Sequence, residues 1–168
     1  RALYIDDMAR IIYPSGIVVN PSLNTENIIY PINDGNLYLL GYEYIILRTP
    51  FINVKRNNIN KDVKEVLITM GGSDIRDLTP LIMNSICREY PNIQFNIVIN
   101  NTFHNLGRIE STKISNTELH YNVDELLMRD LMIKSDIAIS AAGQTIYELL
   151  ATSTPFIAIK IIDNQSNN

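Results

Sequence analysis

The chain has 168 residues, 46% of them hydrophobic, a formal net charge of −4 and a pI near 5.1. At about 100–200 residues per domain, this length predicts one domain with part of a second, and the acidic balance argues against nucleic acid as a partner. No apolar stretch approaches the ~20 residues of a membrane span, and no signal peptide is recognisable. A single cysteine, Cys87, excludes an internal disulfide and is typical of a reducing compartment, so we expect a cytoplasmic protein.

The first fifty residues contain short apolar runs that are bounded by turn-forming residues. Such runs predict buried strands, here at residues 2–5, 16–19 and 37–40. The spacers are too short for full crossover helices, which indicates the tail of an α/β domain. Residues 50–60 are polar and are interpreted as a linker. We therefore expect residues 1–54 to form the tail of an N-terminal Rossmann-like domain plus the linker.

After the linker, strand-like and helix-like patterns alternate along the chain. Strands are expected at residues 65–70, 95–99, 119–121, 136–140 and 155–161. Helical spacing of apolar residues predicts helices at residues 78–89, 123–133 and 144–151. Residues 101–111 are expected to be an irregular connection. This alternation predicts an α/β fold with a Rossmann-like parallel sheet over residues 55–168, and both ends of the chain look like cuts through a longer protein.

Two turns follow strands at positions where an open parallel sheet binds its ligands. The first contains Gly71, Gly72 and Ser73, with Asp74 next to them. Paired glycines allow close approach of a ligand or a positive φ, and Ser73 and Asp74 could cap a helix that begins near Asp77. A tight strand-to-helix turn without a ligand explains this motif equally well.

The second turn is built almost entirely from small residues. Ala142 and Gly143 follow the expected strand, and Gln144 and Thr145 begin the expected helix. The first amides of a helix favour an anion, most often a phosphate. The turn is neither a Walker A loop, because no lysine follows the glycine, nor a GxGxxG dinucleotide fingerprint.

Glu148 lies one helical turn after Thr145, so both side chains are expected on the same face of the helix. A carboxylate there could accept hydrogen bonds from both ribose hydroxyls while the amides hold a diphosphate. The alternative is a solvated surface glutamate.

The remaining polar candidates are weaker. Asn164 and Gln165 follow the last expected strand and could contact a sugar or form a turn. His104 and His120 have no neighbours at metal-ligand spacing, so no metal site is expected. Asp6 and Asp7 at a strand end could be catalytic or could cap a turn.

Taken in order, these motifs resemble a known family. The residues that carry the resemblance are the Gly-Tyr-Glu-Tyr-Ile-Ile-Leu-Arg stretch of residues 41–48, the Gly-Gly-Ser-Asp turn, residues 136–148 and Asn164-Gln165. The chain resembles the UDP-diacetamido-trideoxy-altropyranose hydrolases of pseudaminic acid biosynthesis and the related spore-coat polysaccharide proteins. Both groups are similar to the glycosyltransferase that adds GlcNAc to lipid I, which has the two-domain GT-B architecture.

The resemblance implies hydrolysis of a UDP-linked amino sugar at the anomeric position, by water, with no metal or other cofactor. The implied diphosphate contacts are Gly143, Gln144 and Thr145, beside Ala142 where many relatives have a second glycine. Glu148 is the implied ribose contact. Gly71, Gly72 and Ser73 would line the cleft, and Gln165 would contact the substrate. Tyr44 and Asn164 would approach the sugar and the attacking water.

The chain departs from the family at one point that matters for catalysis. The family's essential histidine lies in a Gly-x-Gly-His turn of the first domain, and this chain contains no such sequence. We therefore expect the chain on its own to be inactive. Two alternatives stay open: a GT-B glycosyltransferase, or a non-catalytic nucleotide-sugar-binding module fused to a cytidylyltransferase. A dimer or a fusion to another sugar-biosynthesis domain is the expected assembly.

Overall fold

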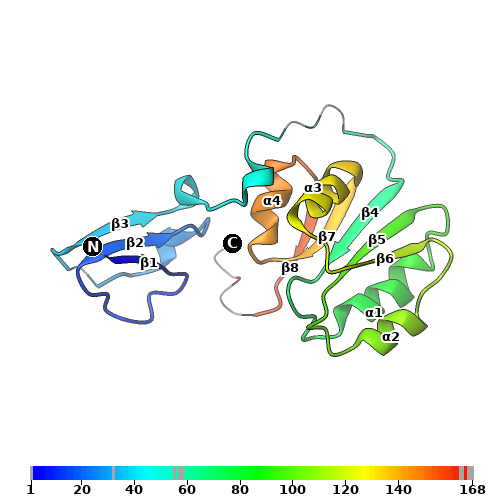
Figure 1. Cartoon of the computed structure of the whole chain (residues 1–168), viewed down its shortest axis with the longest axis horizontal. Helices are drawn as coiled ribbons and strands as arrows, with labels where there is room; N and C mark the ends of the chain where they lie inside the picture. The colour runs from blue at the N-terminus through cyan, green and yellow to red at the C-terminus, as the bar shows by residue number, and fades with distance from the viewer. Residues whose placement is uncertain (1, 32, 55, 57–58, 163–164, 166–168) are drawn as a thin grey trace. The chain divides into compact units, whose positions relative to one another are not determined.

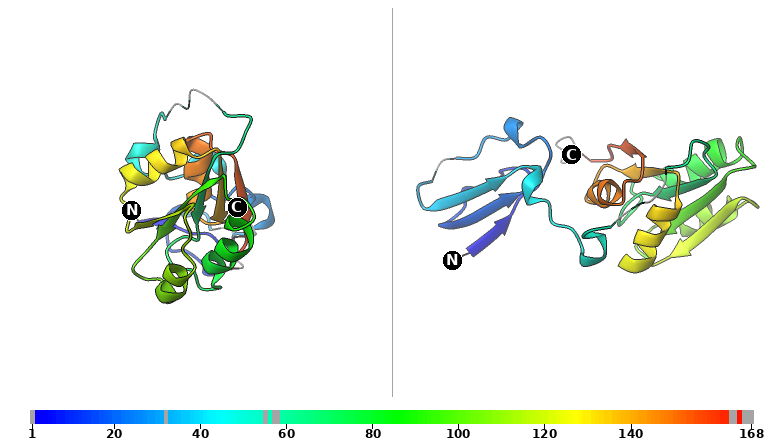
Figure 2. Two further views of the ribbon diagram at one scale, coloured as in Figure 1. Left: turned by 90° about the vertical axis from the view of Figure 1, so that its right-hand side faces the viewer. Right: turned by 90° about the horizontal axis from the view of Figure 1, so that it is seen from above.

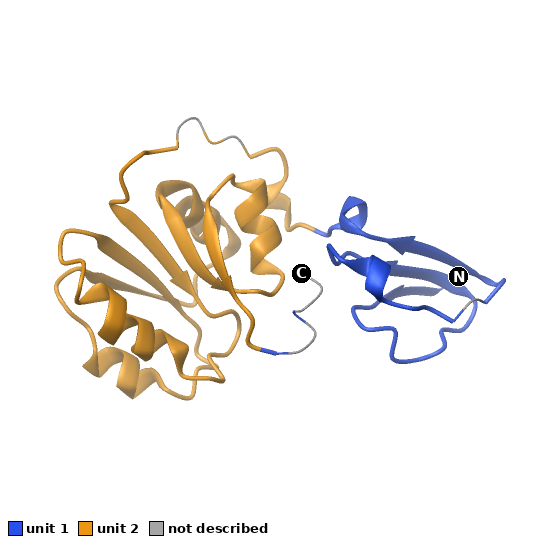
Figure 3. Cartoon of the chain, turned by 180° about the vertical axis from the view of Figure 1, so that it is seen from behind, with its two compact units in different colours: residues 1–46, 162–168 blue, residues 47–161 orange. Residues whose placement is uncertain are grey.

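The computed structural model describes residues 2–31, 33–54, 56, 59–162 and 165. The chain divides into unit 1, residues 1–46 and 162–168, and unit 2, residues 47–161 (Figure 3). Each unit has its own sheet. The domain boundary expected after residue 54 concerns a longer protein and stays a prediction.

Unit 1 is built on a three-stranded parallel sheet. Its strands are β1 (Ala2–Ile5), β2 (Gly16–Asn20) and β3 (Asn36–Leu40), in that order across the sheet. The described residues between them form only one regular element, the 3-10 turn η1 (Thr25–Asn27), and a second 3-10 turn, η2 (Tyr42–Tyr44), follows β3. The strands that the sequence predicted are thus present, without crossover helices in the described connections.

Unit 2 is built on a five-stranded sheet in which every pairing is parallel. The strands are β4 (Glu65–Thr69), β5 (Gln94–Ile99), β6 (Thr117–Tyr121), β7 (Ile137–Ala141) and β8 (Phe156–Ile159). Their order is β6-β5-β4-β7-β8, so β4 lies in the centre. The expected α/β fold with a Rossmann-like parallel sheet is confirmed.

Helices cover both faces of this sheet. They are α1 (Leu78–Ile82), which continues into the π-helical segment η4 (Met83–Cys87), α2 (Leu106–Ser111), α3 (Glu125–Lys134) and α4 (Thr145–Ala151). In Figures 1 and 2, α1 and α2 lie on one face and α3 and α4 on the other. The carboxylate of Asp124 caps α3 by accepting a 2.8 Å hydrogen bond from the Leu127 amide.

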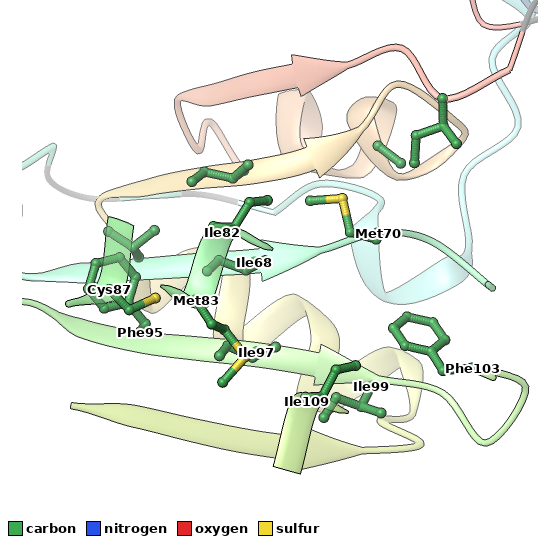
Figure 4. Close-up of a cluster of buried hydrophobic side chains, with 14 residues drawn as sticks. Ile68, Met70, Ile82, Met83, Cys87, Phe95, Ile97, Ile99, Phe103 and Ile109 are labelled. Atoms are coloured by element: carbon green, nitrogen blue, oxygen red, sulfur yellow. The ribbon is translucent and has the colours of Figure 1, made fainter. Parts of the chain in front are cut away.

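Apolar side chains fill both sides of the sheet. Alternate residues of β4 point to opposite faces, as strand geometry requires: Val66 and Ile68 pack with α1 and α2, whereas Leu67 packs with α3 and α4. Figure 4 shows the first cluster, in which Ile82 and Met83 lie over the strands. Strands that are buried on both faces read as continuous apolar runs, which explains why the sequence located them well.

Two sequence-based expectations need correction. Residues 101–111 are not irregular throughout, because they contain α2, whose Ile109 is fully buried against α1 and the sheet. The expected linker at residues 50–60 begins inside the core of unit 2, because Phe51 is 1% exposed and belongs to the cluster beneath α3 and α4. None of the described helices is long and apolar enough to cross a membrane.

Candidate functional site

The carboxyl edge of the unit 2 sheet has a point where successive connections leave in opposite directions. The connection after β4 enters α1 on one face, and the connection after β7 enters α4 on the other (Figure 1). Because β4 and β7 are neighbours, their turns flank a topological switch point, which is where open α/β sheets bind their ligands. A Cβ atom built on Gly71 would lie 4.0 Å from the Cβ of Ala141, so the two turns are adjacent.

The turn after β4 needs glycine and caps its own helix. Gly71 has a φ of +74°, in the region that favours glycine. The fully buried Asp74 carboxylate accepts 2.8 Å hydrogen bonds from the amides of Leu78 and Thr79 and a 3.0 Å bond from Asn105 Nδ2. These helix amides already have an acceptor, so the part of the motif at Asp74 fits the tight-turn interpretation.

Gly72 and Ser73 are exposed at the same edge of the sheet. The hydroxyl of Thr102, in the connection after β5, donates a hydrogen bond to the Gly72 carbonyl. The turn is therefore held from the neighbouring connection while its residues face solvent. Their contact with a ligand stays a prediction.

The turn after β7 is buried on its strand side and open on its helix side. Ala142 is 6% exposed, has no positive φ, and donates a 2.9 Å hydrogen bond from its amide to the Ile159 carbonyl of β8. The backbone at position 142 therefore accommodates an alanine. Gly143 and Thr145 are partly exposed and Gln144 is exposed. The predicted diphosphate contacts thus face outward from the switch point.

Glu148 is not a solvated surface residue, so that alternative is wrong. Its side chain is 6% exposed, and its two carboxylate oxygens accept hydrogen bonds from Nε of Arg48 at 2.7 Å and from Nη2 at 2.9 Å. The hydrogen bonds that Arg48 donates to the Glu148 carboxylate raise the pKa of Arg48. The Arg48 guanidinium also lies 5.1 Å from the centre of the Phe51 ring.

Arg48 ends the stretch of residues 41–48 that carries the resemblance, but the sequence alone assigned it no role. It lies 100 positions from Glu148, in an extended segment before the 3-10 turn η3 (Thr49–Phe51). Neither helical nor strand periodicity links residues so far apart. The signal in the sequence was that Arg48 and Glu148 both lie in stretches that carry the resemblance to the family.

Unit 1 carries a second polar cluster, at the end of β1. Asp6 accepts hydrogen bonds from the hydroxyls of Tyr13, at 2.6 Å, and Tyr30, and from the amides of Met8, at 3.2 Å, and Ala9, at 2.7 Å. Burial opposes its ionisation, but these four donors outweigh burial and lower its pKa. The bonds to the following amides support the capping interpretation of Asp6.

The structure brings together the predicted site residues of unit 2, from the two turns and α4. Tyr44 ends η2 in unit 1, and Gln165 accepts a 3.4 Å hydrogen bond from the Ile162 amide; their approach to a sugar stays a prediction. Asn164 lies outside the described residues.

Both histidines have polar partners within the chain. His104 Nε2 lies 3.2 Å from Oδ1 of Asp77, whose Oδ2 accepts a 2.6 Å bond from Arg108. His120 Nε2 lies 3.0 Å from Oδ1 of Asn96. Within the described part of the chain, no three His, Cys, Asp or Glu side chains gather as metal ligands would.

Comparisons with known proteins agree with the resemblance. The pseudaminic acid cytidylyltransferase and UDP-2,4-diacetamido-2,4,6-trideoxy-beta-L-altropyranose hydrolase of Helicobacter pylori is 31% identical over 158 residues, which are 94% of this chain and 28% of that protein. An uncharacterized protein of Methanocaldococcus jannaschii is 28% identical over 132 residues, 73% of this chain and 27% of that one. The chain thus spans little more than a quarter of the length of either relative. No protein-family model matches the sequence.

Among solved structures, UDP-GlcNAc 2-epimerase from Neisseria meningitidis bound to UDP-GlcNAc shares 25% sequence identity with the chain. The match has a TM-score of 0.47 and covers 60% of this chain and 28% of the epimerase.

Proposed function

We propose that unit 2 binds the nucleotide of a UDP-linked amino sugar, because 94% of the chain is 31% identical to a protein whose name includes UDP-2,4-diacetamido-2,4,6-trideoxy-beta-L-altropyranose hydrolase. The whole protein would then split this sugar nucleotide at the anomeric position with water, releasing UDP and the free sugar. It would serve the synthesis of a nonulosonic acid or a surface polysaccharide. In this proposal unit 2 belongs to the C-terminal half of a GT-B architecture.

The observation that carries the proposal is the pair of small-residue turns at the β4–β7 switch point. Their adjacency leaves backbone and small side chains, rather than bulky groups, at the edge where a parallel sheet binds ligands. A diphosphate is a bulky anion that needs close approach to backbone amides, and turns of this composition permit it. Glu148, one helical turn into α4, adds an acceptor that suits ribose hydroxyls.

Each predicted residue then has a role. Gly143, Gln144 and Thr145 hold the diphosphate and Glu148 holds the ribose. Ser73 and its neighbouring glycines face the substrate from the other turn. Tyr44, Asn164 and Gln165 contact the sugar and the attacking water.

A second candidate is a nucleotide-sugar-binding module that serves a fused enzyme. The Helicobacter pylori relative favours this candidate, because its name combines a cytidylyltransferase with a hydrolase. The 168 residues contain no Gly-x-Gly-His sequence, so no activity is expected of this chain by itself under either candidate. Incubation of the 168-residue chain with a UDP-linked amino sugar is therefore expected to release no UDP, and measurable release would contradict this expectation.

Calorimetric titration of the chain with UDP, CDP and inorganic diphosphate tests the nucleotide site. We expect UDP to bind more tightly than diphosphate, and Glu148→Ala to weaken UDP by about 1–3 kcal/mol, the value of charged hydrogen bonds, with little effect on diphosphate. Glu89→Ala, at an exposed carboxylate after η4, is the matched control and should change neither. Equal weakening of UDP and diphosphate would disprove the ribose contact, and failure of UDP to bind the unaltered chain would disprove the nucleotide site.

A further inference from the structure

The ion pair between Arg48 and Glu148 has a role beyond holding unit 2 together. We infer that Arg48 is the positioning residue of the nucleotide site: it fixes the Glu148 carboxylate in one orientation and leaves its remaining acceptor positions for a vicinal diol. The inference rests on the proposed function, in which Glu148 contacts ribose. It adds a residue to the site and explains how a buried carboxylate can serve there.

The first argument is the geometry of the pair. The guanidinium approaches both carboxylate oxygens, Nε at 2.7 Å and Nη2 at 2.9 Å, in the forked arrangement that fixes a carboxylate most firmly. Each carboxylate oxygen can accept about two hydrogen bonds, so each keeps one acceptor position after Arg48 is bound. Two acceptor positions on one rigid carboxylate match two neighbouring hydroxyls of a ribose.

The second argument is the unequal burial of the two partners. The Glu148 side chain is 6% exposed, whereas the Arg48 side chain is 46% exposed. A buried carboxylate is costly unless a partner compensates its charge, and an exposed guanidinium has no comparable need. Arg48 therefore serves Glu148: without the arginine, Glu148 would take up a proton, turn toward water or destabilise α4.

The third argument is that both partners stand on the same rigid support. Arg48 lies over Phe51, and Glu148 precedes Leu149 in α4. Phe51 is 1% exposed and Leu149 is fully buried, and both belong to one hydrophobic cluster. Packed side chains have few alternative rotamers, so the pair is held in place before any ligand arrives.

The test separates an effect through Glu148 from a direct contact of Arg48 with the ligand. UDP and 2′,3′-dideoxy-UDP are titrated into the 168-residue chain and into Arg48→Ala, Glu148→Gln and the double variant, in ~0.3 M NaCl to screen long-range charge effects. For UDP, we expect each single variant to lose at least ten-fold in affinity, and the double variant to be no more than two-fold weaker than Glu148→Gln. For dideoxy-UDP, which lacks the diol, we expect Arg48→Ala to change affinity less than two-fold.

Three results would overturn the inference. A further loss of five-fold or more on adding Arg48→Ala to Glu148→Gln would mean that Arg48 touches the ligand itself. An equal loss for UDP and dideoxy-UDP would mean that the arginine does not act on the diol. Full UDP affinity in Arg48→Lys, which keeps the charge but not the fork, would mean that forked geometry is not needed.

Controls keep these results interpretable. Arg129 pairs with the adjacent, exposed Asp130 by donating from Nε and Nη2 to a single oxygen, Oδ1, so Arg129→Ala should leave UDP binding unchanged. Thermal unfolding shows whether each variant is folded. If Arg48→Ala alone unfolds, the double variant still serves, because it removes both charges and leaves no unpaired buried carboxylate. If the unaltered chain binds no UDP, the proposed function fails and the inference fails with it, whereas binding of UDP with any of the three results above overturns the inference alone.

Discussion

The Tyr13 hydroxyl donates a 2.6 Å hydrogen bond to Oδ1 of Asp6, joining the end of β1 to the loop that leads into β2. Three further donors reach the same carboxylate, which is 8% exposed. The charged form of Asp6 is therefore part of the folded state of unit 1, and this has a consequence for its stability at low pH.

The pKa of Asp6 is lower in the folded chain than its usual value, because hydrogen bonds from tyrosines and amides outweigh the effect of burial. A group with a lowered folded pKa stabilises the fold above its unfolded pKa of about 3.9, and this contribution is lost as the pH falls through the folded value. We expect Asp6→Asn to lower the free energy of unfolding by about 1–3 kcal/mol at neutral pH, with the difference from the unaltered chain shrinking as the pH falls below the unfolded pKa of about 3.9. Urea unfolding followed by circular dichroism at several pH values measures this, and a difference that does not vary with pH would contradict it.

The Cys87 thiol is expected to be unreactive in the folded chain. It is fully buried in the cluster of Figure 4, and burial raises its pKa to about 11. Since the thiolate is the reactive form, only about one thiol in a thousand would be ionised at pH 8, and no reagent could reach it. Ellman's reagent should therefore label the chain at pH 8 only after denaturation. Rapid labelling under native conditions would place Cys87 at the surface.

Phe51 is expected to be essential for the stability of unit 2, although it lies in a segment that looks like a linker. It is 1% exposed and packs in the cluster with Leu67 and Leu149. Phe51→Ala should cost about 3–5 kcal/mol, the usual range for truncating a buried phenylalanine. The neighbouring Ile52 is 55% exposed, so Ile52→Ala is the matched control and should change stability by less than about 0.5 kcal/mol. Similar small effects from both substitutions would show that the segment is not part of the core.

The side chain of Asn116 is expected to stabilise the end of η4 and the connection that follows it by hydrogen bonds. Its side-chain nitrogen lies 3.0 Å from each of three carbonyl oxygens, those of Cys87, Tyr90 and Ile93, and the residue is 8% exposed. Asn116→Ala should cost about 1–3 kcal/mol, because the carbonyls lose a buried donor. Asn116→Asp should cost more at neutral pH, since a carboxylate would face those carbonyls. Denaturant unfolding measures both, with exposed Asn92→Ala as the reference, and an Asp variant as stable as the parent would refute this arrangement.

Local signals were sufficient for most of the fold. β4, β5 and β7 are rich in apolar residues because helices cover both their faces, so their hydrophobicity and the turn residues around them located them. The helix α2 was missed because Gly107 and the preceding asparagines favour turns, whereas burial of Ile109 against α1 decides its conformation. That contact is tertiary and leaves no mark on neighbouring residues.

The candidate site shows the same difference between residues found from local signals and residues that depend on tertiary contacts. Its glycine and alanine turns were visible because turn chemistry depends on adjacent residues, and the position of Glu148 followed from helical spacing. The partner of Glu148 could not be found in this way, because Arg48 reaches it only after the whole sheet has folded. Burial of the carboxylate depends on the same folding, which is why a solvated glutamate had been a reasonable alternative.

The turn after β4 also limits how the sequence can evolve. The φ of +74° would strain any other side chain at position 71, whereas a Cβ there would stand in ordinary van der Waals contact with that of Ala141, at 4.0 Å. Position 71 is therefore expected to stay glycine in related sequences, whatever small residue stands at position 141. A glycine kept at this position would mark the same edge of the sheet even where the rest of the sequence has diverged.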